Sequence, residues 1–429
     1  MRLQRKRKKL DKKNEEGHRL VKDKITSNSQ VKYNRKKYYL LFILFIIIVI
    51  FFSLILKIKF LLSPKVQLKR KLKKYYNYTK EEALQKGRNY LDKCLEGKLI
   101  NKTKFEQSKE PKISVIIPLY NNEKKIKNVI RSVQNQNMED IEIIIINDFS
   151  KDNSSKIVEE LQIDDKRIKL INNQKNLGIL HSRAIGILEA KGKYITNLDH
   201  DDLFFDEDVF EVAYEEAEEN SFDIISFLSL DSINYYLKVN EMINISCSKI
   251  PDNFTIYQPN LTYRLMFENE RFKYFDIWIW GKLILANTYK EAINLLGKER
   301  YSMFNVINED VIALFSICLC SKSYKFIRKY GIFHYRNRNT ASQKVTREHF
   351  MLMDVFFSDI LFDLSKNENK KYAAFIIIPI KTKYYFTLKI PETKAYLAKV
   401  IKKIMNCSYI EEKYKNEIRQ NYSNFGLVG

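Results

Sequence analysis

Short apolar runs alternate with segments of helical periodicity over residues 113–228, and this alternation constrains the fold more than any other feature. The apolar runs lie at residues 113–118, 141–146, 167–171, 194–198 and 222–228. The first intervening segment has the i, i+3, i+4, i+7 spacing of a helix with one buried face, at Ile126, Val129, Ile130 and Val133. Strands that alternate with helices are joined by right-handed crossovers. The pattern therefore predicts an α/β fold, a Rossmann-like and mostly parallel sheet with helices on both faces.

Polar and acidic residues directly follow the predicted strands. The carboxyl ends of parallel strands lie at the same edge of a sheet, and ligands of open α/β sheets bind there. Four strands bring such residues to this edge: Pro118, Tyr120 and Asn121; Asn147 and Asp148; Asn176 and Arg183; Asp199, Asp201 and Asp202. The sequence thus predicts a ligand site built from four separate loops.

The glycine-rich loops that usually cradle phosphates are absent from this sequence. There is no G-x-G-x-x-G after the first strand and no G-x-x-x-x-G-K-[ST] anywhere. Asp199 and Asp201, two residues apart after a buried strand, indicate a Mg²⁺ or Mn²⁺ site, since these ions prefer oxygen ligands together with substrate phosphates. The alternative is an acidic helix start, because the following acids at 206–208 suit a helix dipole.

Three segments, in order and with their spacing, carry a family resemblance. They read SVIIPLYNNEKKIKNVIRSVQNQ, EIIIINDFSKDNS and NQKNLGILHSRAIGILEAKGKYITNLDHDD. Residues 113–227 thereby resemble the family 2 glycosyltransferase domain, which has the GT-A fold. The resemblance implies that a hexosyl or N-acetylhexosaminyl group moves from a nucleotide-sugar donor, such as a UDP-sugar, to an acceptor hydroxyl. It also implies inversion at the anomeric carbon and dependence on Mn²⁺ or Mg²⁺.

The resemblance assigns several residues to the donor site. Pro118, Tyr120 and Glu123 match the first nucleotide-binding loop, with Tyr120 near the base. Asp148 matches the acid that accepts a hydrogen bond from uracil, and Asn147 stands where many members have another aspartate. For Tyr120 and Asp148 the alternative is a turn residue at a strand end.

Further positions match donor-binding and metal-binding residues of the family. Arg183 matches an arginine near the base and phosphates, Asp199 an acid near the ribose, and Asp201 the metal ligand. Two positions depart from the family pattern: Ala184 replaces an asparagine, and His181 replaces a small residue. These departures leave the donor sugar open.

The second half of the chain supplies candidates for catalysis, metal binding and acceptor binding. Asp310, with Glu309 second, stands where the family has its catalytic base; the alternative is a helix start capped by Asn308. His334 is a candidate second metal ligand, or a structural histidine. Trp280 is a weaker candidate for stacking on an acceptor sugar, or a core residue.

A membrane-spanning helix is predicted at residues 38–56, where 19 residues carry no charge. Residues 1–37 hold 15 Lys and Arg against 4 Asp and Glu, and residues 57–74 hold 8 Lys and Arg without any acid. The larger N-terminal charge favours a cytoplasmic N-terminus, and hence a single-pass type II protein of the Golgi or endoplasmic reticulum with a lumenal catalytic domain. Triplets of the N-glycosylation type after residue 76 agree with this orientation.

Five segments follow along the chain. They are a basic tail (1–37), the transmembrane helix (38–56), a stem (57–110) with a helix near residues 81–95, a GT-A domain (111–345) and a helical C-terminal region (346–429). Residues 75–429 keep a net charge of only +4, which argues against a nucleic-acid partner. The expected partners are a nucleotide-sugar donor, a glycan, glycoprotein or glycolipid acceptor, and a membrane.

Two alternative functions stay open. A nucleotidyltransferase shares the fold class, but it normally has a glycine-rich loop with Arg and Lys after the first strand, which residues 118–122 lack. A catalytically degenerate GT-A-like protein would bind a sugar nucleotide or scaffold a complex. The intact Asp199, Asp201 and Asp310 favour an enzyme.

Overall fold

The structure is a computed structural model of the chain, which divides into two compact units, Met1–Lys71 and Leu72–Gly429. It describes residues 15–20, 22, 79–99, 106, 108–232, 243–244, 255–257, 278–302, 309–335, 398–403, 405–406 and 412–422. In the first unit, residues 15–20 are helical. No helix within the described ranges is long and apolar enough to span a bilayer, and the predicted span at 38–56 lies outside those ranges.

The described strands form one mixed ten-stranded sheet, in the order β3-β2-β1-β4-β9-β6-β10-β5. The parallel strands at one end are β3 (Ile168–Asn172), β2 (Ile141–Asn147), β1 (Ile113–Leu119) and β4 (Tyr194–Asn197). These are four of the five predicted strands, and the fifth is β6 (Ile224–Ser232). β1 and β2 are buried at every residue because helices cover both of their faces.

Antiparallel pairings extend the sheet, and of the strands that join it there, only β10 lies where the sequence pattern indicates a strand, near residues 324–332. β9 (Lys282–Leu285) runs antiparallel to β4 and β6. β10 (Ser323–Tyr335) runs parallel to β6 and antiparallel to β5 (Leu203–Phe204). Two short strands lie off this path: β7 (Ile243–Asn244) on β6 and β8 (Thr255–Tyr257) on β10. The α/β class is confirmed, and the sheet is mixed because these short strands join it.

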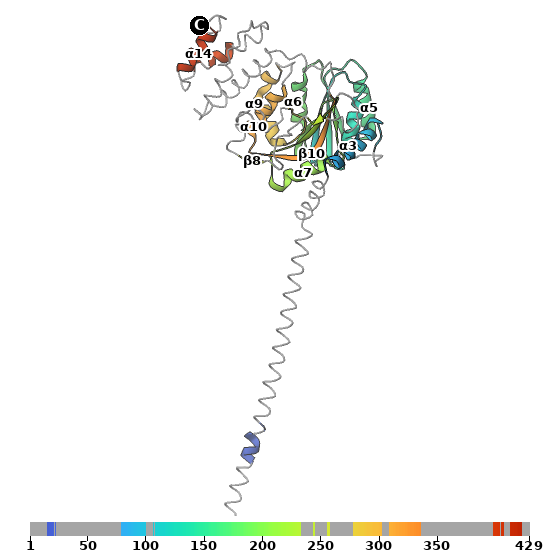
Figure 1. Ribbon diagram of the computed structural model, residues 1–429, viewed down its shortest axis with the longest axis vertical. Helices are drawn as coiled ribbons and strands as arrows, with labels where there is room; N and C mark the ends of the chain where they lie inside the picture. Colours follow the sequence, from blue (N-terminus) through green and yellow to red (C-terminus); the bar gives the residue numbers. More distant parts are fainter. Residues whose placement is uncertain are drawn as a thin grey trace, which may run out of the picture. The chain divides into compact units, whose positions relative to one another are not determined.

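Helices lie on both sides of the sheet, with α6, α9 and α10 on one side and α3 and α5 on the other (Figure 1). The helix bounds are α3 (Lys80–Leu95), α4 (Ile126–Gln134), α5 (Ser154–Asp164), α6 (Ile179–Glu189), α7 (Val209–Asn220), α9 (Ala286–Ser302), α10 (Glu309–Cys320) and α14 (Glu412–Tyr422). α6 packs directly on β1 and β2, because Gly186 leaves room for Ile116 and Ile146. A Cβ at Gly186 would lie 2.6 Å from Cδ1 of Ile146.

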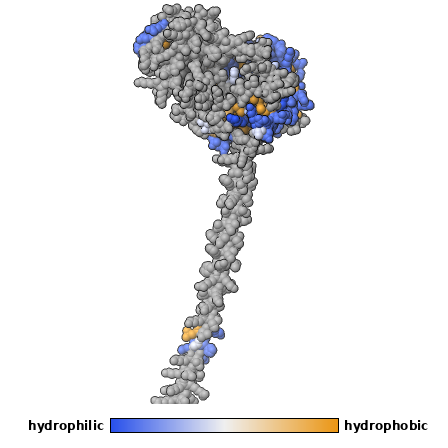
Figure 2. Space-filling model, in the orientation of Figure 1, coloured by the Kyte–Doolittle hydropathy of each residue, from blue (hydrophilic) through white to orange (hydrophobic). Residues whose placement is uncertain are grey.

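Helix α3, predicted as the helical part of the stem, packs against the sheet domain. It begins at Thr79 with a capping box, in which Thr79 and Glu82 exchange hydrogen bonds. Its apolar face joins a core cluster: Leu84, Leu91, Leu203, Phe205, Leu230 and Phe333. On the face shown in Figure 2, the described surface is mostly hydrophilic, with a small apolar area between hydrophilic ones.

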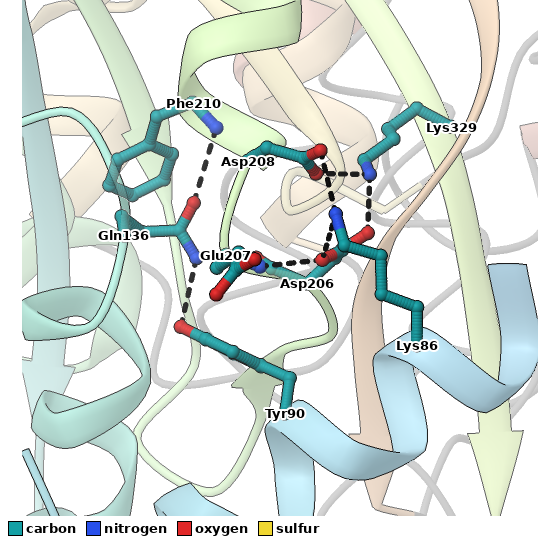
Figure 3. A network of polar contacts seen from close by, with 8 residues as sticks. All are labelled: Lys86, Tyr90, Gln136, Asp206, Glu207, Asp208, Phe210 and Lys329. Atoms are coloured by element: carbon teal, nitrogen blue, oxygen red, sulfur yellow. Dashed lines mark hydrogen bonds and ion pairs between the residues drawn. The ribbon is translucent and has the colours of Figure 1, made fainter. Parts of the chain in front are cut away.

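A buried polar network also fixes α3 to the domain (Figure 3). Lys86 of α3 lies 2.8 Å from Oδ2 of Asp208 and 3.1 Å from Oδ1 of Asp206. Lys329 of β10 pairs with both carboxylates as well. Two cations thus neutralise two buried acids. Asp208 precedes α7 without making a side-chain cap hydrogen bond, so its carboxylate serves the lysines instead.

Candidate active site

Arg183 brings three predicted acids together. Its side chain, on α6, is 1% exposed. Nη1 donates to Oδ1 of Asp310 at 2.5 Å and to Oε1 of Glu309 at 3.2 Å, while Nη2 donates to Oδ1 of Asp199 at 2.5 Å. We call these four residues the acid cluster. The loop after β4 and the start of α10, 127 residues beyond Arg183, therefore meet at one guanidinium.

Burial and neighbouring carboxylates raise the pKa values of the acids in the acid cluster. Burial, together with the like charge of Asp310, raises the pKa of Glu309 to about 7. Burial also raises the pKa of Asp310, although Arg183 opposes that shift. Burial alone would lower the pKa of Arg183, but the surrounding carboxylates raise it. The cluster thus holds a carboxyl group that can exchange a proton near neutral pH, as a general base requires.

Two buried polar residues of β4 and α9 bind each other, and one of them, Tyr289, lies near enough to Arg183 to interact with its charge. The Asn197 side chain, at the end of β4, donates from Nδ2 to the hydroxyl of Tyr289 of α9 at 3.1 Å. The side-chain atoms Arg183 Nε and Asn197 Oδ1 are buried and have no hydrogen-bond partner. The sequence analysis assigned no role to Asn197 or Tyr289. Asn197 could have been identified as a candidate site residue because it is a polar residue at the end of a buried strand.

The loop after β4 is bound to the loop after β1. His200 Nδ1 lies 3.1 Å from the carbonyl oxygen of Pro118, and Asn122 Nδ2 donates to the carbonyl oxygen of His200 at 2.6 Å. Pro118 itself is buried in β1. The structure thus places the predicted nucleotide-binding loop, residues 118–123, beside the loop with the predicted metal ligand, residues 198–202. We call the latter the metal loop.

Asp202, to which the sequence analysis gave no role, anchors the end of β10. The carboxylate is fully buried. It accepts a hydrogen bond from the backbone N–H of Tyr335 at 3.1 Å and faces Nδ1 of His334 at 3.0 Å. Burial raises the pKa of Asp202 to about 7, against the opposing effect of His334. The strand β10 therefore carries His334 to the edge that holds Asp201.

The side chains near Asp201 supply only some of the ligands that a divalent cation needs. Within the described ranges no three or more His, Cys, Asp or Glu residues form a group that could hold a metal ion. His334 contacts the carboxylate of Asp202 through Nδ1. Metal-binding histidines are usually oriented in this way, by a hydrogen bond from the ring nitrogen that does not bind the metal. A carboxylate suits Mn²⁺ or Mg²⁺ when substrate phosphates and water complete the coordination, whereas an imidazole is a more usual ligand for softer divalent ions. Asp201 therefore fits such an ion together with a phosphate ligand, and His334 fits it less well.

Trp280 is buried in an aromatic stack. Its ring lies 5.6 Å from that of Trp278 and 5.3 Å from that of His334, nearly parallel to both. Only 2% of Trp280 is exposed. This burial agrees with the core-packing alternative, and the acceptor role of Trp280 stays a prediction.

Asp148 and Glu123 both hold neighbouring loops. The Asp148 carboxylate accepts hydrogen bonds from the N–H of Leu177 at 2.8 Å and from that of Gly178 at 2.9 Å, which fixes the loop before α6. Glu123 Oε2 accepts from the backbone and side chain of Asn153, both at 3.0 Å. Their placement at the strand ends agrees with the sequence analysis, and their contacts here are to the protein.

Two exposed aromatic residues follow neighbouring strands at the same edge. Tyr120, after β1, is 43% exposed, and Phe149, after β2, is 39% exposed. Phe149 has a positive φ of 67°, an uncommon conformation for an aromatic residue. The sequence predicts a role for Tyr120 and none for Phe149.

Comparisons with known proteins agree with this architecture. Residues 114–273 match the family model described as Glycosyl transferase family 2. The chain is 34% identical to the "Uncharacterized glycosyltransferase EpsJ" of Bacillus subtilis, over 44% of this chain and 52% of that protein. It is 28% identical to "Glycosyltransferase GlyA" of Streptococcus pneumoniae, over 56% of this chain and 33% of that protein. The chain thus spans about half of one relative and a third of the other.

A third relative and a solved structure extend the comparison. The "Cholesterol galactosyltransferase" of Borreliella burgdorferi is 28% identical over 56% of this chain and 64% of that protein. The fold resembles that of S. aureus TarS 1–349 in complex with UDP-GlcNAc, with a TM-score of 0.50 and 14% identity over 72% of this chain and 85% of that one. The chain is therefore similar to family 2 glycosyltransferases over residues 114–273 and to named glycosyltransferases over about half of its length, and its fold resembles that of TarS 1–349.

Proposed function

We propose that the protein transfers a sugar from a UDP-sugar to an acceptor hydroxyl by a single inverting displacement. The observation that carries the proposal is the acid cluster, in which Arg183 holds two candidate bases beside the donor loops. The glycosyltransferase names of the relatives support the reaction class, and the UDP-GlcNAc of TarS supports the choice of donor.

Asp310 is the proposed catalytic base. It takes the proton of the acceptor hydroxyl while that oxygen bonds to the anomeric carbon and the bond to the diphosphate oxygen breaks. Arg183 fixes the carboxylate of Asp310 through the 2.5 Å contact. Glu309, with its pKa raised to about 7, is the second candidate. Both acids begin α10, so the helix sets their direction.

The donor site is proposed to lie along the loops after β1, β2 and β4. Tyr120 and Asp148 bind the base and Asp199 the ribose, while Asp201 and His334 would hold Mn²⁺ or Mg²⁺. When bound, the cation neutralises charge on the departing diphosphate. The proposed acceptor is a glycan, glycoprotein or glycolipid. Membrane anchoring at 38–56 and location in the Golgi or endoplasmic reticulum stay predictions.

The test is donor turnover by the full-length chain in detergent micelles. A panel of UDP-, GDP- and CMP-sugars is assayed for nucleotide release with Mn²⁺ and with a chelator. We expect one UDP-sugar to be turned over, and Asp310→Asn to reduce kcat by about 10²–10⁴-fold. Asp164→Asn, an exposed aspartate on α5, is the matched control and should match the wild type.

Two results would count against the proposal. One is the absence of turnover for every nucleotide sugar, and the other is full activity of Asp310→Asn. If Asp201→Ala kept both full turnover and its response to Mn²⁺, the metal-binding role of Asp201 would be wrong while the reaction class could stand.

A further inference from the structure

Lys125 links the loop after β1 to the end of β10. It precedes α4, and its Nζ lies 3.7 Å from the ring centroid of Tyr335, the last residue of β10. An ammonium this close to an aromatic face is attracted to it. The contact therefore holds a positive charge at the edge of the sheet where the donor loops meet.

The same edge carries the predicted metal loop. The backbone N–H of Tyr335 donates to Oδ1 of Asp202 at 3.1 Å. His200 and Pro118 join the metal loop to the loop that leads into Lys125. Lys125 is thus brought beside the metal loop from two directions, by β10 and by the loop after β1.

The electrostatic surroundings agree with this placement. Burial lowers the pKa of Lys125, while the carboxylates of Asp201 and Asp202 act against that shift. The lysine is half-buried and remains near enough to both acids to interact with their charge. In addition, the first turn of α4 contains no acidic residue, and no side chain caps its N-terminus. The positive end of that helix dipole therefore adds to the charge of Lys125.

We propose that Lys125 binds the diphosphate of the donor and supplies a protein-borne positive charge beside the metal site. This inference rests on the proposed function. A nucleoside diphosphate needs cationic partners, and the chain has no glycine-rich phosphate loop. Arg183 is already bound to three carboxylates, so its charge is compensated within the acid cluster. A lysine ammonium is a common phosphate ligand.

The test compares nucleotides that differ only in phosphate content. Binding of UDP, UMP and uridine to the full-length chain is measured by calorimetry, with a chelator and again with Mn²⁺. We expect Lys125→Gln to weaken UDP binding by about tenfold or more and uridine binding by less than about twofold. Lys125→Arg keeps the charge and should bind UDP within about threefold of the wild type.

Lys124→Gln is the matched control, because Lys124 is the exposed neighbour in the sequence. It should bind all three ligands as the wild type does. Equal UDP affinity for Lys125→Gln and the wild type would overturn the inference and leave the proposed function standing. An equal loss for uridine and UDP would also overturn it, because Lys125 would then act on the fold or the base site. A wild-type protein that binds no UDP would refute the proposed function as well.

Discussion

Replacing Lys329 with methionine should destabilise the fold by about 3–5 kcal/mol. Lys329 is 9% exposed, and its partners Asp206 and Asp208 are 4% and 2% exposed. In the wild type, two lysines balance two aspartates. Methionine fills similar volume without charge, so two buried carboxylates would then share Lys86 alone. The expected loss comes from this uncompensated buried charge.

Two companion variants make the reasoning quantitative. The side chain of Lys86 is 27% exposed, so water can solvate part of the carboxylate charge that removal of Lys86 leaves uncompensated. Lys86→Met should therefore destabilise the fold by only about 1–3 kcal/mol. The double variant Lys329→Met with Asp208→Asn restores one cation for one carboxylate. It should therefore be more stable than Lys329→Met alone, with a coupling energy of about 0.5–3 kcal/mol.

Urea unfolding of the full-length chain, followed by tryptophan fluorescence, measures these differences. Both tryptophans lie in the sheet domain, next to His334 of β10. Burial would raise the pKa of Asp208, but Lys329 and Lys86 outweigh it and hold that pKa below its usual range. The stability that this pairing contributes is present above the unfolded pKa of an aspartate, about 4, and is lost as the pH falls through the folded pKa. The reasoning is refuted if Lys329→Met unfolds no earlier than Lys86→Met, or if the double variant recovers nothing.

The acid cluster and a glycine in the bend before β4 give three further expectations. Arg183→Met should cost about 3–5 kcal/mol in urea unfolding and abolish turnover, and a change below about 1 kcal/mol would contradict this. Turnover should rise with pH, because the base must be deprotonated and burial raises the pKa of Asp310 and that of the second candidate, Glu309, the latter to about 7; a flat kcat/KM profile from about pH 6 to 8 would exclude Glu309 as the base. Gly192→Ala should cost about 1–3 kcal/mol, since its Cβ would lie 2.5 Å from the backbone N of Ser114, and an unchanged urea midpoint would disprove that clash.

The parallel half of the sheet could be predicted because its strands are buried on both faces. Five of the seven residues in each of β1 and β2 are isoleucine, valine or leucine, so both strands stand out in the sequence. β5 and β9 could not be predicted in this way, since they have two and four residues and no periodicity that distinguishes them from loops. Their place depends on pairing with strands far away in the sequence.

The candidate site was predictable residue by residue, but its connections were not. The position of Asp199 after a strand and of Asp310 at a helix start marked each acid separately. That both would bind Arg183 depends on the packing of α10 against α6. Asp202 was missed because its partner His334 lies 132 residues further along the chain. A buried aspartate next to two more exposed ones has no sequence signature of its own.

The network around α3 shows the same limitation. The sequence predicts a helix start at the acids of residues 206–208, and only the tertiary structure shows that Asp206 and Asp208 bind lysines. Lys86 belongs to a helix that the sequence predicts correctly but assigns to a stem. Local periodicity identifies such a helix, whereas the residues that it pairs with are determined by the folded chain.

The charge of the site leads to one more prediction, on donor affinity. The acid cluster and the metal loop are both rich in carboxylates, yet the proposed donor is itself an anion. Burial raises the pKa of Glu309 to about 7, so protonation near neutral pH removes negative charge from the acid cluster. With a chelator present, UDP should therefore bind more tightly at about pH 6 than at about pH 8, whereas turnover changes in the opposite direction because the base must lose its proton. Calorimetry at both pH values tests this, and a UDP affinity that increases with pH would show that these carboxyl groups do not face the donor.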